Sequence, residues 1–332
     1  MGLKVGDDLL PGVGAKVKDV DEGCDTLLYL ALLPADAKEP RARNEEAGRT
    51  ALVNLQAELE DEAAKKLRFH QLDVASRESV EKFRQTFSRI HGEQSVDILI
   101  NNAGIFTGNI VPELLKEHGQ ATMSINYWGV RNMNDAFETL LAPYARVVVV
   151  ASRFGGLRSI TNERTKQRLL SPDLTQEEID QFAEEYLKVC QTGDPAKVDE
   201  AGFATFPYGI SKALVIALTR VQGRRMATDP RQRCILANSC CPGAVLTDML
   251  KSSAAFGETK VGDAVFPGFP NVKNIEEGCD TIMYLALLPN GATEPNGKFV
   301  AERQLVDWEN YLSPQEFVAK FEEARKKEKT SG

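Results

Sequence analysis

The sequence has no hydrophobic run that approaches the ~20 residues needed to cross a bilayer, so it predicts no membrane-spanning helix. It also has no excess of positive charge, and a formal net charge of −8 excludes the basic surface that binds nucleic acid. The start lacks a secretory signal, and Gly6 stands where a myristoylation signal has a hydroxyl residue. We therefore expect a cytoplasmic protein with neither a nucleic-acid partner nor a membrane partner.

Residues that bind metals through nitrogen or sulfur are scarce. The chain has 3 histidines and 6 cysteines, and these follow neither the C-x-x-C pattern nor the histidine spacing of a zinc site. We predict no metal site and interpret the cysteines as reduced thiols of a reducing compartment. They are Cys24, Cys190, Cys234, Cys240, Cys241 and Cys279.

One segment occurs twice. EGCDTLLYLALLP begins at Glu22, and EGCDTIMYLALLP begins at Glu277. The similarity starts earlier, with KVGDDLLPG from Lys4 and KVGDAVFPG from Lys260, and nothing between the copies repeats. Repeat folds need several units of about 20–50 residues, so two distant copies do not indicate one. We interpret residues 1–40 as a duplicate of a segment that belongs near the end of a domain.

From residue 44 onward, helical and strand patterns alternate. Helices are predicted over residues 44–67, over residues 77–92 after the N-cap Ser76, over much of residues 112–144, and from Tyr208. The predicted strands are RFHQLDV, VDILINNAG, RVVVVAS, RCILANSCCPG and KFVAERQ. This alternation predicts an α/β domain over residues 41–310 with a parallel sheet, followed by a charged helical tail over residues 311–332.

YGISK places the phenol of Tyr208 four positions before the ammonium of Lys212, on one face of a helix. A nearby ammonium favours the phenolate, so we expect a lowered Tyr208 pKa. Such a phenol suits proton transfer to a carbonyl oxygen. The motif alone is weak, because surface helices often contain such pairs.

Polar groups also stand where strands end. RVVVVAS ends at Ser152, VDILINNAG ends in residues 101–104, and PGAVLTD follows a third strand at residues 242–248. Asn126 lies on the helix after the second of these strands. The carboxyl ends of parallel strands share one sheet edge, where α/β proteins bind ligands, so these groups are expected to meet.

These motifs and their order resemble the short-chain dehydrogenase/reductase superfamily, from Arg43 to about Trp308. The resemblance implies a Rossmann-like, doubly wound parallel sheet in a single domain. It implies that Tyr208 is the acid/base, that Ser152 polarises the carbonyl and that Lys212 holds the nicotinamide ribose. Asn126 then supports a water relay to the lysine.

The resemblance also implies NADPH as the cofactor. Its expected contacts, besides Tyr208 and Lys212, are Arg43 at the 2′-phosphate, Asp73 at the adenine, Asn102, Ala103 and Gly104 along the cofactor, and Pro242, Gly243 and Thr247 at the carboxamide. An arginine fork suits a phosphate dianion.

Ser152 and Tyr208 are further apart than in most members, and the insert SPDLTQEEIDQFAEEYLKVCQ is typical of the carbonyl reductase subgroup. The resemblance implies small carbonyl substrates (ketones, aldehydes and quinones), a monomer, and in some members binding of glutathione conjugates near the CCPG cysteines. Cys241 then has two interpretations, a packed thiol or a reactive, glutathione-contacting one, and the residues leave both open.

The family's T-G-x-x-x-G-x-G loop, which binds the pyrophosphate at a helix N-terminus, is not found in the sequence. PGVGAK at Pro11 is no substitute, because no convincing strand precedes it and a third glycine is missing. We therefore expect a domain that lacks its first strand–loop–helix unit, with residues 1–40 in its place. The alternatives to an impaired reductase are a catalytically inactive, cofactor-free interaction protein and the product of an incomplete gene.

Overall fold

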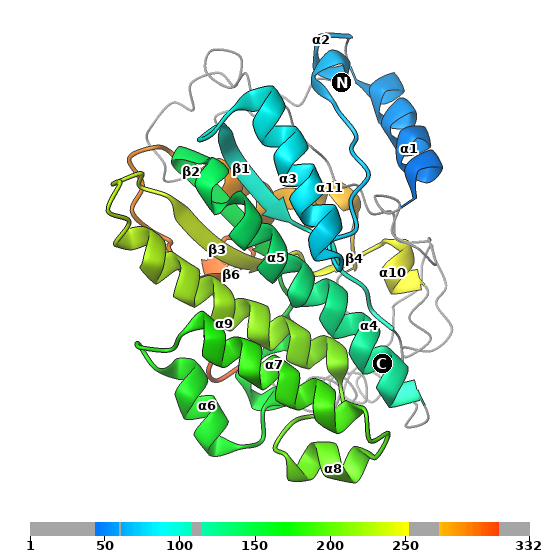
Figure 1. Ribbon diagram of the computed structural model, residues 1–332, viewed down its shortest axis with the longest axis vertical. Coiled ribbons are helices and arrows are strands. Elements are labelled where there is room, and N and C mark those ends of the chain that lie inside the picture. The colour runs from blue at the N-terminus through cyan, green and yellow to red at the C-terminus, as the bar shows by residue number, and fades with distance from the viewer. Residues whose placement is uncertain (1–43, 60, 108–113, 252–271, 312–332) are drawn as a thin grey trace, which may run out of the picture.

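Among the described residues, the main sheet has four parallel strands and a short antiparallel one, in the order β1-β2-β3-β6-β7 (Figure 1). The structure is a computed structural model that describes residues 44–59, 61–107, 114–251 and 272–311. The strands are β1 (Val96–Asn101), β2 (Leu141–Val150), β3 (Leu236–Cys241), β6 (Phe299–Ala301) and β7 (Gln304–Leu305). A separate parallel pair joins β4 (Ala244–Val245) to β5 (Val272–Lys273).

The valine run of β2 forms an interior strand of this sheet. β-Branched side chains favour extended backbone and pack well on a pleated surface. Val148 lies opposite Ile100 of β1 and Asn238 of β3, so β2 is paired on both sides. Its side chains alternate between the two faces of the sheet, and Val147 and Val148 accordingly belong to different core clusters.

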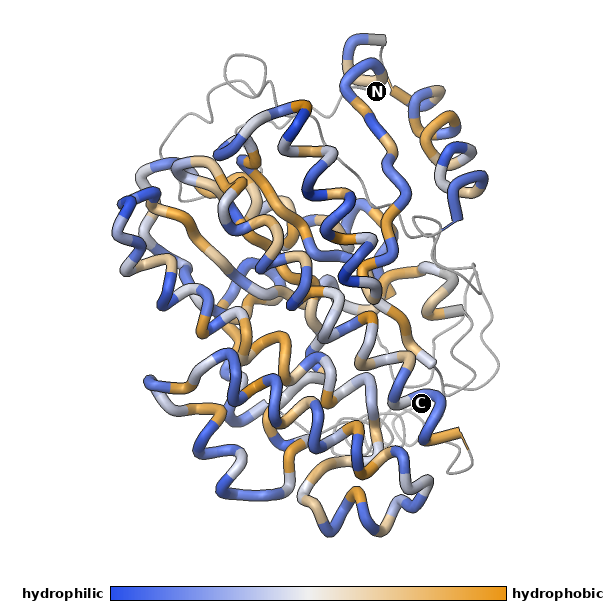
Figure 2. Tube along the Cα trace, in the orientation of Figure 1, coloured by the Kyte–Doolittle hydropathy of each residue, from blue (hydrophilic) through white to orange (hydrophobic). Residues whose placement is uncertain are grey.

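Helices cover both faces of the sheet. α3 (Arg77–His91), α5 (Trp128–Phe137) and α9 (Pro207–Ala227) lie on one face, and α11 (Ile275–Ala286) lies on the other (Figure 1). Hydrophobic residues follow the strands between these layers (Figure 2). The predicted α/β, Rossmann-like, doubly wound parallel sheet in a single domain is confirmed.

Residues 68–74 do not form the predicted strand, and they belong to none of the described strands. A parallel strand needs a neighbour for its backbone hydrogen bonds. In the described sheet β1 is an outer strand that pairs only with β2, and of residues 68–74 only Arg68 makes a single β-bridge. The prediction of a helix after Ser76 is confirmed, since Ser79 N donates to Ser76 Oγ at 3.2 Å.

The helix predicted over residues 44–67 is two helices, α1 (Glu45–Glu58) and α2 (Asp61–Lys66). α1 begins where Asn44 Oδ1 accepts from Ala47 N at 3.0 Å. The break falls in the acidic sequence ELEDE, residues 58–62. Like charges one turn apart destabilise a helix, which accounts for the interruption.

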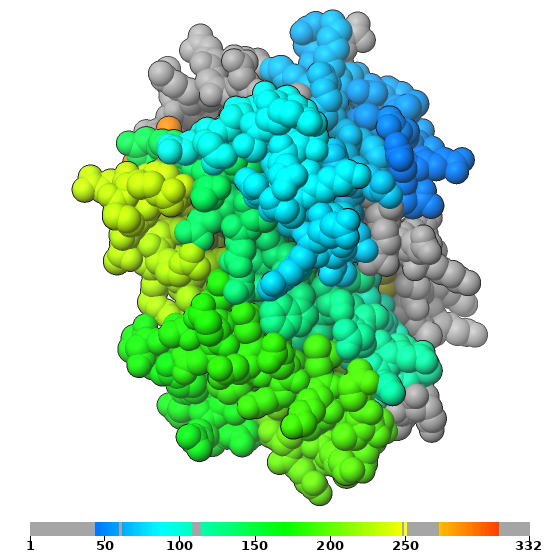
Figure 3. All heavy atoms as spheres, viewed as in Figure 1, coloured from blue at the N-terminus to red at the C-terminus, as the bar shows by residue number. Residues whose placement is uncertain are grey.

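The insert between Ser152 and Tyr208 forms α6 (Glu163–Leu170), α7 (Gln176–Cys190) and α8 (Pro195–Glu200). α7 spans most of the sequence SPDLTQEEIDQFAEEYLKVCQ. It begins at a capping box in which Thr175 Oγ1 accepts from Glu178 N at 3.2 Å and a Glu178 oxygen accepts from Thr175 N at 2.9 Å. α7 packs against α4 (Leu115–Asn126) and α9. Figure 3 shows the insert, in green, at one end of the molecule.

Short helices complete the described elements: η4 (Glu138–Leu140), η5 (Arg153–Gly155), η6 (Leu157–Ser159) and α10 (Asp248–Lys251). In this part of the chain, no helix has the length and apolar character to cross a membrane. The duplicated segment 1–40, Arg43 and the tail from residue 312 lie outside the described residues.

Candidate active site

Tyr208, Ser152 and Lys212 meet at the carboxyl edge of the sheet. Ser152 lies just beyond the end of β2, and Tyr208 lies in the first turn of α9. The Ser152 side chain lies beside the Tyr208 hydroxyl, where it acts as a hydrogen-bonding group that lowers the pKa of the phenol. The Nζ atom of Lys212 lies 5.6 Å from the centre of the Tyr208 ring, as their spacing on one helix face predicts. A hydroxyl, a phenol and an ammonium therefore converge on one point.

Lys212 is buried, with 4% of its surface exposed. Its Nζ donates to the carbonyl oxygen of Val150 at 2.7 Å, at the last residue of β2. Burial lowers the pKa of Lys212 to about 8, and the thiols of Cys241 and Cys240 oppose this only in part. At neutral pH the fold thus holds a buried ammonium beside the phenol.

The pKa of Tyr208 moves in the direction opposite to the sequence prediction. Burial raises it well above its ordinary value of 10.0, the Cys241 thiol adds to the rise, and the hydrogen bond from Ser152 opposes it. A phenolate in this enclosed position loses its stabilisation by water. This loss is larger than the stabilisation that the Lys212 ammonium provides, so desolvation decides the direction of the pKa shift. The prediction of a lowered pKa is wrong for this chain, and Tyr208 is a protonated phenol at neutral pH.

Asn126 holds the loop that follows β1. Its Oδ1 accepts from Ile105 N at 2.8 Å, and its Nδ2 donates to Ile105 O at 2.9 Å and to Ser211 Oγ at 3.1 Å. A Cβ atom added at Gly104 would lie 3.3 Å from Asn126 Oδ1 and 3.4 Å from Lys212 Nζ. The loop therefore passes directly over both side chains, with Asn102 exposed and Ala103 and Gly104 partly buried.

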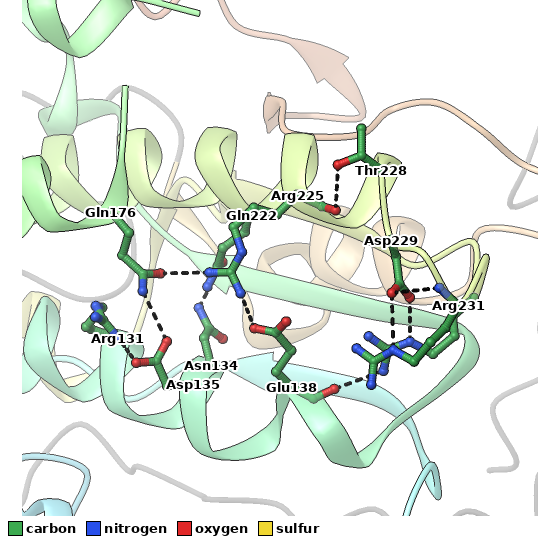
Figure 4. Close-up of polar contacts among 11 residues, drawn as sticks. Arg131, Asn134, Asp135, Glu138, Gln176, Gln222, Arg225, Thr228, Asp229 and Arg231 are labelled. Carbon is green, nitrogen blue, oxygen red and sulfur yellow. Dashed lines mark hydrogen bonds and ion pairs between the residues drawn. The ribbon is translucent and has the colours of Figure 1, made fainter. Parts of the chain in front are cut away.

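A chain of buried amides fixes the end of β1 beneath this loop. Asn101 Nδ2 donates to Asn134 Oδ1 at 2.7 Å, and Asn134 Nδ2 donates to Gln222 Oε1 at 3.0 Å. Figure 4 shows Asn134 and Gln222 facing each other between α5 and α9. All three side chains are buried, so each amide satisfies its neighbour. The base of the loop is thereby tied to the helix that carries Tyr208.

Pro242, Gly243 and Thr247 form the loop after β3. Gly243 has φ +88°, a conformation that favours glycine, and a Cβ atom there would lie 3.2 Å from Lys273 Cε. Thr247 N donates to Val245 O at 2.7 Å. The loop is thus folded tightly against β5, at the same sheet edge as Ser152.

Known proteins are similar to this chain in sequence and in fold. A family described as short chain dehydrogenase matches residues 41–163. Carbonyl reductase (NADPH) 1 of Mus musculus is 33% identical over 269 residues, which cover 80% of this chain and 87% of that protein. Carbonyl reductase (NADPH) 3 of Rattus norvegicus is 31% identical over the same shares. The chain belongs to the short-chain dehydrogenase/reductase family. The structure of salutaridine reductase from Papaver somniferum has the same fold, with a TM-score of 0.60 at 24% identity over 77% of this chain and 88% of that one.

The remaining residues that the family resemblance singles out lie in other parts of this short-chain reductase. Asp73 lies in the turn before α3, where its carboxylate accepts from Ala75 N at 3.1 Å and its own N donates to Ser79 Oγ at 2.9 Å. Arg43 lies outside the described residues. The structure therefore brings Ser152, Tyr208 and Lys212 together, with Asn126 and Lys212 both close to Gly104, and the roles of these residues stay predictions.

Three phenylalanines around Tyr208 were not singled out from the sequence. The ring centres of Phe106, Phe206 and Phe154 lie 5.1, 6.0 and 6.5 Å from that of Tyr208. Phe106 lies in the loop after β1, Phe206 is the residue before α9, and Phe154 lies in η5. Phe106 and Phe154 each follow a strand end within a few residues, and this position was the available signal. The rings form an apolar, partly exposed surround for the phenol.

Cys240 and Cys241 end β3 behind the site. Cys240 is fully buried, and burial raises its pKa well above the ordinary value. Cys241 is 6% exposed. This burial favours the packed-thiol interpretation of Cys241 over a reactive one, since reactive thiols need access. Within the part of the chain that the structure describes, no three histidine, cysteine or acidic residues cluster as a metal site.

Proposed function

We propose that this chain reduces small carbonyl compounds to alcohols with NADPH as the hydride donor. The observation that carries the proposal is the Lys212 ammonium 5.6 Å from the centre of the Tyr208 ring, with Ser152 beside the phenol hydroxyl. The names of the relatives support the reaction and the cofactor, because the mouse and rat proteins are NADPH carbonyl reductases.

The residues present fit a nicotinamide cofactor. Gly104 leaves no room for a side chain between the loop and the Asn126–Lys212 pair, and Gly243 has the conformation of a tight turn. Both features keep backbone accessible at the sheet edge. When bound, NADPH supplies a hydride. The residues proposed to hold it are Arg43, Asp73, Asn102, Ala103, Gly104, Tyr208, Lys212, Pro242, Gly243 and Thr247.

The proton is supplied by the chain itself. Ser152 and Tyr208 can both donate hydrogen bonds to a carbonyl oxygen placed between them, which polarises the carbonyl. As negative charge develops on that oxygen, Tyr208 transfers its proton. The raised pKa does not prevent this transfer, because an alkoxide is far more basic than a phenolate. Lys212 stabilises the resulting phenolate through its charge.

Tyr208→Phe tests the proposal, because it removes the proton donor and keeps the ring among the phenylalanines. We expect ketone-dependent oxidation of NADPH to fall by about 10²- to 10⁴-fold. The matched control is Tyr144→Phe, which makes the same change at an exposed position on β2. Quinone reduction serves as a second readout, since a quinone accepts hydride without this acid. Unchanged ketone reduction in the Tyr208 variant would overturn the assignment.

A further inference from the structure

A charged group lies beside the site at the same sheet edge. Arg153 is the residue after Ser152, and its Nη2 lies 3.4 Å from a Glu302 carboxylate oxygen. The other Glu302 oxygen lies 3.4 Å from the Nζ of Lys273, the residue that packs on Gly243. Two cations share one carboxylate, so the group carries a net charge of +1. It spans the edge from the end of β2 to β5.

The guanidinium of Arg153 has hydrogen-bond donors that are not fully paired. Its Nε is enclosed and has no hydrogen-bond acceptor within the described part of the chain. Nε and Nη2 form the edge of the fork that binds a carboxylate with two parallel hydrogen bonds. Glu302 occupies this edge with one long contact, although the Arg153 side chain is 34% exposed and accessible. An enclosed donor without a partner is rare in folded proteins and marks a site that something else completes.

A neighbouring arginine shows the filled arrangement. Arg303 follows Glu302 in the same hairpin, and its Nε donates to Asp280 Oδ2 at 2.9 Å while its Nη2 pairs with Oδ1. Arg168 pairs with Glu178 in the same way, with Nε at 2.6 Å and Nη2 at 2.5 Å. These forks each hold a carboxylate from within the chain. The corresponding edge of Arg153 is enclosed at Nε and makes only the long contact to Glu302, so a carboxylate that replaces Glu302 there can complete it.

The position of Arg153 connects it to the carbonyl site. The residue before it contacts the Tyr208 hydroxyl, and the residue after it places a ring 6.5 Å from that of Tyr208. The Arg153 guanidinium carbon lies 6.0 Å from the ring centre of Tyr311, and the Cys241 thiol influences the pKa of both Tyr311 and Tyr208. Arg153 thus stands in the chain between Ser152 and Phe154, two residues that both lie beside Tyr208.

We propose that Arg153 binds a carboxylate carried by the carbonyl substrate, so that the preferred substrates are anionic. The proposal rests on the proposed reductase function. The incoming carboxylate occupies the Nε–Nη2 edge and displaces the long contact to Glu302, which keeps its pairing with Lys273. The phenylalanines around Tyr208 pack against the apolar part that joins the carbonyl to the carboxylate.

The test compares para-acetylbenzoate with its neutral methyl ester. In Arg153→Met we expect the KM for para-acetylbenzoate to rise about tenfold or more, because charge-assisted bonds are lost, while the ester changes by less than about twofold. In Glu302→Gln we expect the KM for para-acetylbenzoate to fall, because a competing carboxylate is removed. Arg164→Met, which makes the same change at an exposed position on α6, should leave both substrates unchanged.

An equal loss for both substrates in Arg153→Met would overturn the proposal, and so would a higher KM for para-acetylbenzoate in Glu302→Gln. Weaker NADPH binding in Arg153→Met would also overturn it, because it would assign Arg153 to the cofactor. Equilibrium binding of para-acetylbenzoate, followed by saturation-transfer NMR, separates this question from turnover. Binding that depends on Arg153 in a chain without reductase activity supports the carboxylate site and contradicts the proposed function. If the active wild-type chain shows no preference for the acid over the ester, the carboxylate site is wrong and the reductase function stands.

Discussion

Raising the pH from about 8 to about 10.5 should stabilise the fold through Lys212. The folded chain holds this lysine with a pKa of about 8, against an ordinary value of 10.5. Below pH 8 both the folded and the unfolded chain carry the proton, and the buried ammonium costs free energy. Between the two values only the unfolded chain binds the proton, so the free energy of unfolding rises with pH and then levels off. A difference of this size corresponds to about 3 kcal/mol.

Buried thiols act in the opposite direction and must be separated from this effect. Burial raises the pKa of Cys240 and Cys190 above the ordinary 9.0. Their thiols keep protons in the folded chain that the unfolded chain releases, so they lower the free energy of unfolding as the pH rises above about 9. Lys212→Met keeps the length and the apolar stem of the side chain and removes its titration. The difference between the two chains therefore isolates Lys212.

Urea unfolding of both chains, followed by tryptophan fluorescence at a series of pH values, gives each free energy by linear extrapolation. The wild-type chain should gain about 3 kcal/mol relative to Lys212→Met across the window. Two curves that stay parallel from about pH 7 to about pH 10.5 would refute the reasoning, since Lys212 would then titrate alike in both states.

Three further outcomes are expected. Asn126→Ala should lower the free energy of unfolding by about 3–5 kcal/mol. The change leaves the backbone N–H and carbonyl of Ile105 without their hydrogen-bond partner, at a cost of about 1–3 kcal/mol each. A loss below about 1 kcal/mol in urea unfolding would contradict this. Light scattering should show a monomer, because α7 packs on α4 and α9 and its Asp180 pairs with Arg131 Nη2 of α5 at 3.1 Å, and a stable tetramer would refute it. Replacing residues 1–40 with a strand–glycine loop–helix–strand segment of a related reductase should raise NADPH affinity by several powers of ten, since charged hydrogen bonds of this kind contribute about 1.5–3 kcal/mol each. Micromolar binding by the unchanged chain in a fluorescence titration would contradict that expectation.

The sequence predicted those parts of the site that depend on local pattern. The valines of β2 specify a central strand, and the residue that follows them had to emerge at the carboxyl edge, which placed Ser152 correctly. The spacing of Tyr208 and Lys212 fixed their common helix face. Asn126 was identified through its place in a motif. Its hydrogen bonds to the backbone of Ile105 are a tertiary contact, which the spacing of residues in the sequence does not predict.

The predictions that failed depend on the surroundings rather than on local pattern. Residues 68–74 have strand composition, but a strand needs a partner, and pairing is a property of the whole sheet. The pKa of Tyr208 depends on how completely the phenol is enclosed, and Lys212 alone did not indicate this. Arg153 pairs with Glu302 of the β6–β7 hairpin, which also pairs with Lys273 of β5, and both are far away in the sequence, so the incompletely paired fork of Arg153 was visible only in the folded chain.

The order of the strands separates two tasks of the site. β1 has β2 on one side and no described strand on the other, whereas the groups proposed to handle the proton lie on β2, α4 and α9, inside the core. The family resemblance assigns the pyrophosphate to a glycine-rich loop after a strand beside β1, and the sequence before residue 44 contains no such loop. Proton donation and pyrophosphate binding therefore depend on different parts of the chain. The titration of Lys212 tests the electrostatics of the proton-donating part even where NADPH binds weakly, and the exchange of residues 1–40 tests the other part without changing Ser152, Tyr208 or Lys212.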